Sequence, residues 1–276
     1  MDVLILYESL TGNTEFGVEV IKLVLEKLGH GCTVRRYRET APGEIGSHDL
    51  YCFATPILNC APMASVWAFM HRLPTRQGAP AFIFSTRGGY PGVAHTLIAL
   101  ELQKHGFAII GNHYLTCETS FPVLRSVFGR FYRSVDLPTK RSLLKLVEFT
   151  GEMAVKAQML QAGLPVDLPR FSFLPGLTLP FALYAVRGGL RNTIGRRTVD
   201  MDKCNLCGIC ALTCPVSAIT LDKELVFNSS CIGCWGCFNT CPRAAIRTNI
   251  VGPANYYSGI KNKESKIKAI GLHKRD

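Results

Sequence analysis

The feature that most constrains the fold of this chain is a duplicated run of cysteines near its C-terminal end. When the 276-residue sequence is aligned with itself at a shift of 27 residues, four cysteines and a proline coincide with four further cysteines and a second proline. The coinciding positions are Cys204, Cys207, Cys210, Cys214 and Pro215 in the first run, and Cys231, Cys234, Cys237, Cys241 and Pro242 in the second run. The repeated pattern C-x2-C-x2-C-x3-C-P predicts two equivalent sites built from thiols.

Disulfides, structural zinc and iron–sulfur clusters all use closely spaced thiols. Disulfides are rare in reducing compartments, and a structural zinc site needs no third and fourth thiol at these offsets. Three thiolates at this spacing instead wrap one corner of an iron–sulfur cube. Gly208, Gly233 and Gly236 let the backbone approach such a cluster closely. The array therefore predicts two 4Fe–4S clusters.

Residues 198–250 resemble the bacterial-type ferredoxins that carry two clusters. In those proteins the fourth cysteine of each run binds the other cluster. The resemblance implies one cluster held by Cys204, Cys207, Cys210 and Cys241, and a second held by Cys231, Cys234, Cys237 and Cys214. Trp235, inside the second run, is expected to cover its cluster from water.

The first 163 residues alternate between two kinds of apolar pattern. Continuous apolar runs predict strands over residues 3–7, 32–38, 50–56, 79–86 and 107–116. Apolar residues at helical spacing predict helices over residues 14–28, 63–72, 93–105 and 139–162. This alternation predicts a doubly wound α/β fold, with a five-stranded parallel sheet and helices on both faces. Ligands of such sheets bind at the carboxyl ends of the strands, which here are residues 9–14, 55–62 and 85–92.

The first of these loops, SLTGNT, opens a helix and is rich in hydroxyl groups. Its backbone N–H groups and hydroxyls are suited to a phosphate at the positive end of the helix dipole. The loop contains no lysine, so it is not a nucleoside triphosphate loop. An ordinary strand–helix turn with a Ser or Thr cap explains the same residues.

With the other two loops, the pattern resembles flavodoxins over residues 1–163. The resemblance implies bound FMN, with its phosphate on Ser9, Thr11, Gly12, Asn13 and Thr14. It implies that one edge of the flavin ring meets Thr55, Pro56, Ile57 and Asn59, and that the other meets Thr86, Gly88, Gly89 and Tyr90. Tyr90 is the expected stacking ring. The 55–62 loop lacks the aromatic residue that flavodoxins often place there, which leaves one flavin face covered by an aliphatic side chain or open.

The whole chain resembles fused flavodoxin–ferredoxin proteins. The expected organisation is a flavodoxin-like FMN domain over 1–163, a connecting strap over 164–197, a small α+β ferredoxin domain over 198–250 and a basic tail over 251–276. The resemblance implies an electron-transfer protein that links one-electron and two-electron partners. The alternative is an FMN-dependent iron–sulfur reductase acting on a small molecule. The sequence shows no acid–base constellation for catalysis.

The charge distribution and composition of the sequence indicate which binding partners and which cellular compartment to expect. Residues 187–276 contain 14 Lys and Arg against 6 Asp and Glu, which predicts redox partners with acidic docking surfaces or a solvated basic tail. No motif supports nucleic-acid binding. The apolar stretch 171–186 is shorter than the roughly 20 residues that a membrane-spanning helix needs, although a membrane-surface contact stays open, as does a homodimer. The N-terminus lacks the features of a signal peptide, and we expect a cytoplasmic protein.

Four cysteines lie outside the duplicated runs. We expect Cys32, Cys52 and Cys117 to be buried thiols, because each falls in or at the end of a predicted strand. Cys60 falls in a predicted flavin-edge loop, where a redox role is an alternative. Arg87, beside the predicted flavin, is expected either to stabilise reduced FMN or to be an ordinary surface arginine.

Overall fold

A computed structural model describes residues 1–126, 136–171, 177–222, 224–252 and 255–273. The N-terminal part is built on a parallel sheet of β1 (Asp2–Tyr7), β2 (Gly31–Arg36), β3 (Leu50–Leu58), β5 (Pro80–Arg87) and β6 (Ala108–Thr116). The spatial order is β2-β1-β3-β5-β6, and each neighbouring pair is parallel. Counted along the chain these five strands have the order 2-1-3-4-5, which defines the flavodoxin-like arrangement. The predicted fold class is confirmed.

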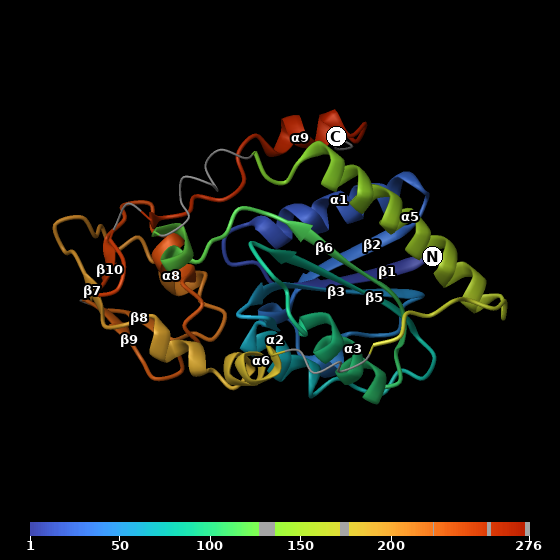
Figure 1. Ribbon diagram of the computed structural model, residues 1–276, viewed down its shortest axis with the longest axis horizontal. Coiled ribbons are helices and arrows are strands. Elements are labelled where there is room, and N and C mark those ends of the chain that lie inside the picture. The colour runs from blue at the N-terminus through green and yellow to red at the C-terminus, as the bar shows by residue number, and fades with distance from the viewer. Residues whose placement is uncertain (127–135, 172–176, 223, 253–254, 274–276) are drawn as a thin grey trace.

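Helices cover both faces of this sheet (Figure 1). On one face α1 (Asn13–Lys27) and α5 (Lys140–Gln161) contribute to a core with Phe16, Leu146 and Met153. On the other face α2 (Ala64–Met70) and α3 (Ala94–Lys104) pack Met70 and Ile98 against the sheet. Short 3-10 turns, η1 (Tyr37–Glu39) and η2 (Pro42–Glu44), follow β2. The strands β1, β3 and β5 are almost fully buried because both faces are covered, which explains their continuous apolar sequences, whereas the edge strand β2 is partly exposed.

One predicted loop has more structure than expected. Residues 55–62 continue β3 and turn back as β4 (Ala61–Pro62), which pairs antiparallel with the end of β3. Asn59 and Cys60 form the two-residue turn, and both have positive φ angles. Consecutive left-handed residues are the mark of a type I′ hairpin turn. This short hairpin fixes one side of the carboxyl edge of the sheet.

The connecting segment leads from α5 to the C-terminal part. Residues 172–176, within the apolar stretch 171–186, lie outside the described residues. The remainder forms α6 (Leu179–Val186) and η3 (Gly189–Thr193). Ala182, Ala185 and Leu190 pack against Ala61 and Leu97 of the N-terminal part. None of the helices in the described residues is long and apolar enough to cross a membrane.

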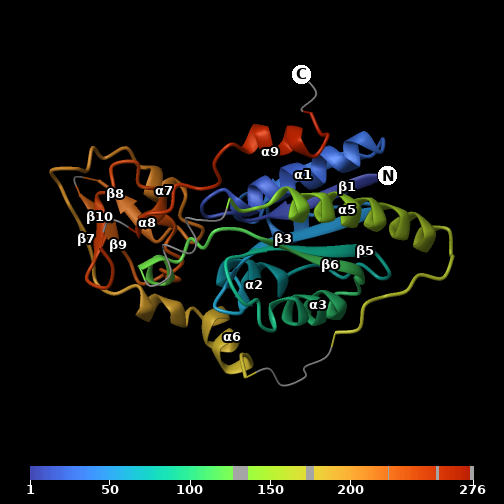
Figure 2. The ribbon, with the colours of Figure 1, turned by 45° about the horizontal axis from the view of Figure 1, so that its top comes forward.

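The C-terminal part is small and lies at the carboxyl edge of the sheet (Figures 1 and 2). Its elements are β7 (Arg197–Val199), α7 (Ile209–Leu212), β8 (Ile219–Leu221), β9 (Leu225–Phe227), α8 (Gly236–Thr240) and β10 (Ile246–Thr248). Antiparallel pairs join β7 to β10 and β8 to β9. This mixture of short strands and helices agrees with the predicted small α+β domain.

After β10 the chain returns to the N-terminal part. The last helix, α9 (Lys263–Ala269), lies beside α1 (Figures 1 and 2). Ile260, Ile267, Ile270 and Leu272 join the core between the sheet, α1 and α5. The described part of this segment is therefore packed, in contrast to the solvated tail that its charge pattern predicts.

Candidate cofactor sites

The eight duplicated cysteines gather around two small enclosed spaces in the C-terminal part. One space is lined by Cys204, Cys207, Cys210 and Cys241. The other is lined by Cys214, Cys231, Cys234 and Cys237. Each space thus takes three thiols from one run and the fourth thiol from the other run. All twelve cysteines of the chain are free thiols, and no three or more His, Cys, Asp or Glu side chains within the described ranges form a group suited to a single metal ion.

The backbone repeats the duplication that the sequence shows. Left-handed residues occur in pairs 27 positions apart: Leu206 with Gly233, Gly208 with Trp235, and Ser217 with Ala244. The amide of Ala218 donates to Cys214 Sγ at 3.2 Å, and the equivalent amide of Ala245 donates to Cys241 Sγ at 3.2 Å. Amides aimed at sulfur stabilise negative charge on thiolates and on clusters. The two runs are therefore equivalent in geometry as well as in sequence.

The second run has a more apolar surrounding and an added cation. Burial raises the pKa of the Cys234 thiol to about 12. A metal bound here would have to supply the stabilisation that ionises this thiol, because the thiolate is the form that binds metal. Arg197 donates to Cys231 Sγ at 2.7 Å, and its guanidinium lies over the Phe227 ring. The donor set of each space, four thiols with amide support, fits a 4Fe–4S cluster.

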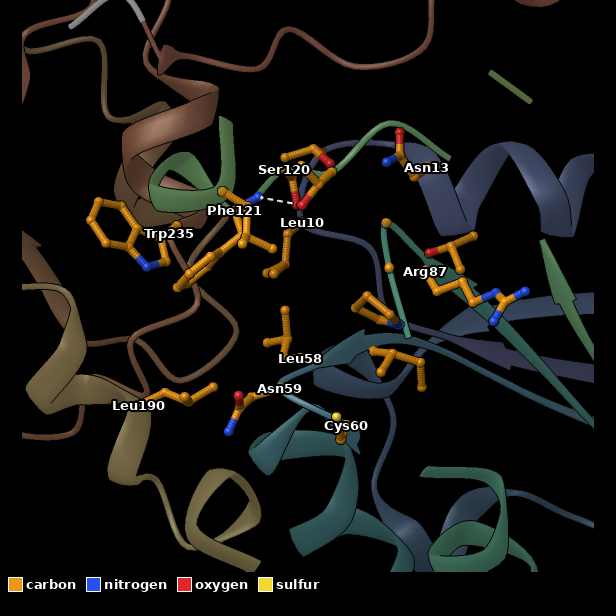
Figure 3. A pocket seen from close by; sticks show the side chains of 18 of the residues that line it. Leu10, Asn13, Leu58, Asn59, Cys60, Arg87, Ser120, Phe121, Leu190 and Trp235 are labelled. Atoms are coloured by element: carbon orange, nitrogen blue, oxygen red, sulfur yellow. Dashed lines mark hydrogen bonds between the residues drawn. The ribbon is translucent and has the colours of Figure 1, made fainter. Parts of the chain in front are cut away.

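A larger cavity of about 570 Å³ lies at the carboxyl edge of the sheet, between the two parts of the chain (Figure 3). This volume falls in the range of cofactor pockets. Of the residues predicted to bind FMN, all but Gly12 and Thr55 line it: Ser9, Thr11, Asn13, Thr14, Pro56, Ile57, Asn59, Thr86, Gly88, Gly89 and Tyr90. Thr55 is fully buried in β3, and Gly12 precedes α1 with a left-handed φ of 84°.

The loop between β1 and α1 presents the positive end of α1 to this cavity. None of the described side chains caps the helix at Gly12, so the N–H groups of the first turn remain available to an anion. The Ser9 hydroxyl accepts a hydrogen bond from the Gly12 amide at 3.1 Å, which shapes the loop. Thr14 and Thr86 hydroxyls lie 2.8 Å apart and join the first loop to the end of β5. The loop geometry fits a phosphate.

The side chain of Asn13 points elsewhere than the sequence suggests. Its Nδ2 donates to the Glu118 carbonyl at 3.3 Å, and its Oδ1 accepts from the Tyr257 hydroxyl at 2.7 Å. Asn13 therefore ties the loop between β1 and α1 to two distant segments, and only its backbone N–H remains for a phosphate.

The other predicted side chains around the cavity differ in their exposure. Tyr90 is 74% exposed and forms an outer wall. Arg87 extends away from the centre of the cavity (Figure 3), and its guanidinium lies over the Tyr114 ring at 5.4 Å. Cys60 is half-buried beside Gly92, and burial raises the pKa of its thiol. Cys52 and Cys117 lie in the core as expected, whereas Cys32 is only half-buried because β2 is an edge strand.

Sequence reasoning missed one side of the cavity. The loop after β6 supplies Glu118, Thr119, Ser120 and Phe121, and the connecting segment supplies Phe181, Tyr184, Leu190 and Thr193. The loop after β6 was predictable, because every parallel strand ends at the same edge of the sheet. The contribution of the connecting segment depends on tertiary packing and has no local signal.

Trp235 lies where the two cofactor spaces meet. It lines both the large cavity and the space of the second run, and it is 1% exposed. Its ring packs edge-on against Phe121 and Phe238. Its indole N–H is buried without a hydrogen-bond partner in the described chain and lies on the side of the ring toward the cavity (Figure 3). The ring that was expected to cover the second cluster thus borders both the thiol-lined space of the second run and the large cavity.

Comparison with known proteins finds similarities in both parts of the chain. The family of 4Fe–4S binding domains matches residues 197–220. The delta subunit of NADH-dependent phenylglyoxylate dehydrogenase from Aromatoleum evansii is 36% identical over 89 residues, which are 32% of this chain and 86% of that subunit. A flavodoxin from the domain Archaea is 17% identical, covers 57% of this chain and 99% of its own, and has a TM-score of 0.45. Flavodoxin 2 from Bacillus cereus is 15% identical, covers 56% of this chain and 99% of its own, and has a TM-score of 0.45.

The strand order of the sheet and the matched 4Fe–4S family define the class: a flavodoxin-like domain fused to a 4Fe–4S ferredoxin domain. Over the 89 matched residues, the chain belongs to the same family as the delta subunit of NADH-dependent phenylglyoxylate dehydrogenase.

Proposed function

We propose that this chain is an iron–sulfur flavoprotein that relays electrons between FMN and two 4Fe–4S clusters. The flavin exchanges one or two electrons and a cluster exchanges one, so the fusion connects two kinds of redox partner. The protein supplies binding, orientation and tuning, and the cofactors supply the redox chemistry.

In this proposal the large cavity holds FMN. The loop of residues 9–14 binds the phosphate with backbone N–H groups and with the hydroxyls of Ser9 and Thr11. The hairpin residues Thr55, Pro56, Ile57 and Asn59 and the loop residues Thr86, Gly88, Gly89 and Tyr90 border the flavin ring. The unpartnered indole N–H of Trp235 supports a polar ligand in this cavity, because a buried donor is normally satisfied.

The two thiol-lined spaces hold the clusters, with crossed ligation. Cys204, Cys207, Cys210 and Cys241 bind the cluster of the first run, and Cys231, Cys234, Cys237 and Cys214 bind the cluster of the second run. The grouping of four cysteines around each space supports this assignment.

The observation that carries the relay is the shared wall between the cavity and the second run. Trp235 borders both spaces, and Leu10 of the loop between β1 and α1 approaches Gly236, whose Cβ position would lie 3.4 Å from both Leu10 and Cys234 Sγ. The second-run cluster is therefore proximal to the flavin and the first-run cluster is distal. Fixing the sites in one chain makes the transfer between them intramolecular.

The distal cluster is the outlet to a protein partner. Cys207 is exposed, and it lies close in sequence to the exposed apolar side chains of Leu206, Ile209 and Leu212. The name of the delta-subunit relative, which belongs to a multi-subunit dehydrogenase, supports a protein partner. The net positive charge of residues 187–276 favours an acidic one. The free thiols suit the reducing conditions of a cytoplasm.

Cofactor analysis and reductive titration of the anaerobically purified chain test the proposal. The chain is purified under anaerobic conditions, its iron and FMN are quantified, and its visible spectrum is recorded during titration with a reductant. We expect about eight irons and about one FMN per chain, with both chromophores reducible. About four irons would reduce the relay to one cluster, and iron without FMN would remove the flavin from it.

One observation favours a second candidate, an FMN-dependent reductase of a small molecule. Tyr90 is 74% exposed, so this wall leaves part of the cavity accessible from solvent. Anaerobic reoxidation of the reduced chain separates the two candidates. Fast, saturable reoxidation by a small acceptor would indicate a reductase, whereas reoxidation only by a ferredoxin-type protein would indicate a relay.

A further inference from the structure

The phosphate loop between β1 and α1 has a close neighbour from the far end of the chain. The ammonium nitrogen of Lys263, the first residue of α9, lies 3.2 Å from the position that a Cβ atom on Gly12 would occupy. The backbone approaches just as closely at Gly259, where a Cβ atom would lie 2.8 Å from the Thr11 carbonyl oxygen. A larger residue at Gly259 would collide with the loop. The segment from 255 to 263 thus lies directly against residues 11–13.

Hydrogen bonds hold this segment at the loop. The buried Tyr257 hydroxyl donates to Asn13 Oδ1 at 2.7 Å, and the Tyr257 amide donates to Asn239 Oδ1 at 3.0 Å. Asn239 in turn donates from Nδ2 to the Ser120 carbonyl at 2.8 Å. The first helical turn of α1, the segment around Tyr257 and α8 of the iron–sulfur part are therefore linked in one hydrogen-bonded chain.

Apolar packing fixes α9 in the same place. Ile267 and Ile270 are buried with α1 and α5. Lys266, also buried, pairs with Asp136 at 2.7 Å and donates to the Pro138 carbonyl at 3.0 Å. Because α9 is anchored on both sides, the position of Lys263 follows from the fold and not from a solvated tail.

The Lys263 ammonium has no ion-pair partner among the described residues. No ion pair within 4.0 Å joins Lys263 to a described carboxylate, in contrast to Lys266. The nearby Glu15 is already paired with Arg36 at 2.5 Å. Residues 9–14 contain no basic side chain of their own, so the loop relies on backbone N–H groups and the helix dipole for positive potential.

We infer that Lys263 is a phosphate-specificity residue of the FMN site, supplied by the C-terminal segment. This inference rests on the proposed binding of FMN. Its ammonium group adds a full positive charge beside a loop that otherwise offers partial charges, and it favours a ligand that ends in a phosphate over one that ends in a hydroxyl. The C-terminal segment thereby becomes part of the cofactor site.

The test compares FMN with riboflavin, which lacks the phosphate. Dissociation constants of both are measured by flavin fluorescence for the full chain and for the variants Lys263→Gln, Lys263→Arg and Lys268→Gln. Lys268 is an exposed lysine of the same helix, so its substitution removes the same charge from the same segment. For Lys263→Gln we expect a loss of FMN affinity of about tenfold at low salt, with riboflavin binding unchanged and a weaker salt dependence for FMN. Lys263→Arg retains most of the affinity, and Lys268→Gln behaves as the unsubstituted chain.

The outcomes separate this inference from the proposed function. Equal FMN affinity for Lys263→Gln and Lys268→Gln would overturn the role of Lys263 while leaving FMN binding intact. Parallel losses for FMN and riboflavin would also overturn it, because they would indicate a general change in the cavity. Failure of the unsubstituted chain to bind FMN would instead overturn the proposed function and, with it, the inference.

Discussion

At the scale of single residues, Trp235 shows most directly how the second cysteine run differs from the first. Its φ angle is 62°, and its counterpart in the first run is Gly208 with a φ angle of 73°. A left-handed conformation costs a non-glycine residue roughly 1–2 kcal/mol. The ring offsets this cost by packing between Phe121 and Phe238 at the wall of the cavity. A strained residue at the junction of two candidate cofactor sites supports a functional origin for the strain.

Substitutions at Trp235 separate its packing from its polar role. Trp235→Phe removes the N–H group but keeps an aromatic ring, and the unpartnered donor contributes nothing to the stability of the chain alone. We expect an unchanged or higher melting temperature for the chain without cofactors, and a three- to tenfold weaker affinity for FMN, as is typical for the loss of about one hydrogen bond. Trp235→Gly, which copies the first run, should lose stability, because a cavity of this size costs about 3–5 kcal/mol. An unchanged FMN affinity in Trp235→Phe would show that the indole does not donate to the flavin.

At the scale of elements, the sequence predicts what depends on local pattern and misses what depends on distant contacts. The five parallel strands and the four helices around them were predicted to within a few residues, because continuous apolar runs and helical spacing are local signals. The hairpin of β3 and β4 was missed, since Asn59 and Cys60 are not the Asn-Gly or Asp-Gly pair that usually signals a type I′ turn. The position of α9 was missed because the apolar residues of a seven-residue helix do not show where it packs.

Between α3 and β6 a buried polar cluster links stability to pH. His95 stacks on Tyr114 with ring centroids 3.5 Å apart and bonds to Asn112 at 2.9 Å. Burial first, and then the charges of His113 and Arg87, hold the pKa of His95 well below its ordinary value. Burial, together with Lys145 and Arg87, lowers the pKa of His113 to about 4. Both imidazoles are therefore neutral in the folded chain at pH 7.

This cluster predicts a loss of stability in mild acid. The unfolded histidines take up protons near pH 6.5, whereas the folded ones resist protonation. The contribution of the neutral histidines is thus fully present above about pH 6.5 and is lost as the pH falls toward 4. The unfolding free energy changes by at most about 1.4 kcal/mol per pH unit for one histidine. We expect a smaller change for His113, which is only partly buried. Urea unfolding of the apo chain at pH 7 and pH 5 measures the effect. His113→Phe, which keeps the stacking on Phe149, should reduce this dependence of the unfolding free energy on pH.

At the scale of the whole molecule, two connections decide how the parts meet. The connecting segment contributes Leu190, whose carbonyl lies 2.2 Å from the Cβ position of Gly233, so only glycine fits there. The C-terminal segment then crosses back over α1 (Figure 2). The sequence predicted a flavodoxin-like part and a ferredoxin part, together with the cysteines that line each small space and the loop residues that line part of the large cavity. It did not predict which cysteine run borders the large cavity, because that order depends on how the two parts pack.

The proposed crossed ligation predicts that the fourth cysteine of each run affects the cluster of the other run. Cys214 belongs to the first run but lines the space of the second run, which holds the proximal cluster in the proposed relay. Cys241 belongs to the second run but lines the space of the first run, which holds the proposed distal cluster. Cys214→Ala should therefore destabilise the cluster beside the flavin and slow electron exchange between the flavin and the iron centres. Cys241→Ala should leave that exchange fast and should impair transfer onward to an external acceptor.

Two measurements check this exchange of roles. Iron content should fall by up to about four atoms per chain in either variant. The control is Cys32→Ala, which removes a half-buried thiol of β2 and should change neither iron content nor electron exchange. After rapid reduction of the flavin, the rate of the cluster absorbance change then distinguishes the two variants. If each run held its own cluster without crossing, Cys241→Ala would be the variant that slows the exchange with the flavin, because Trp235 and Leu10 place the second run against the cavity. Cys214, a residue of the first run, would control the first step of the relay only if the crossed arrangement holds.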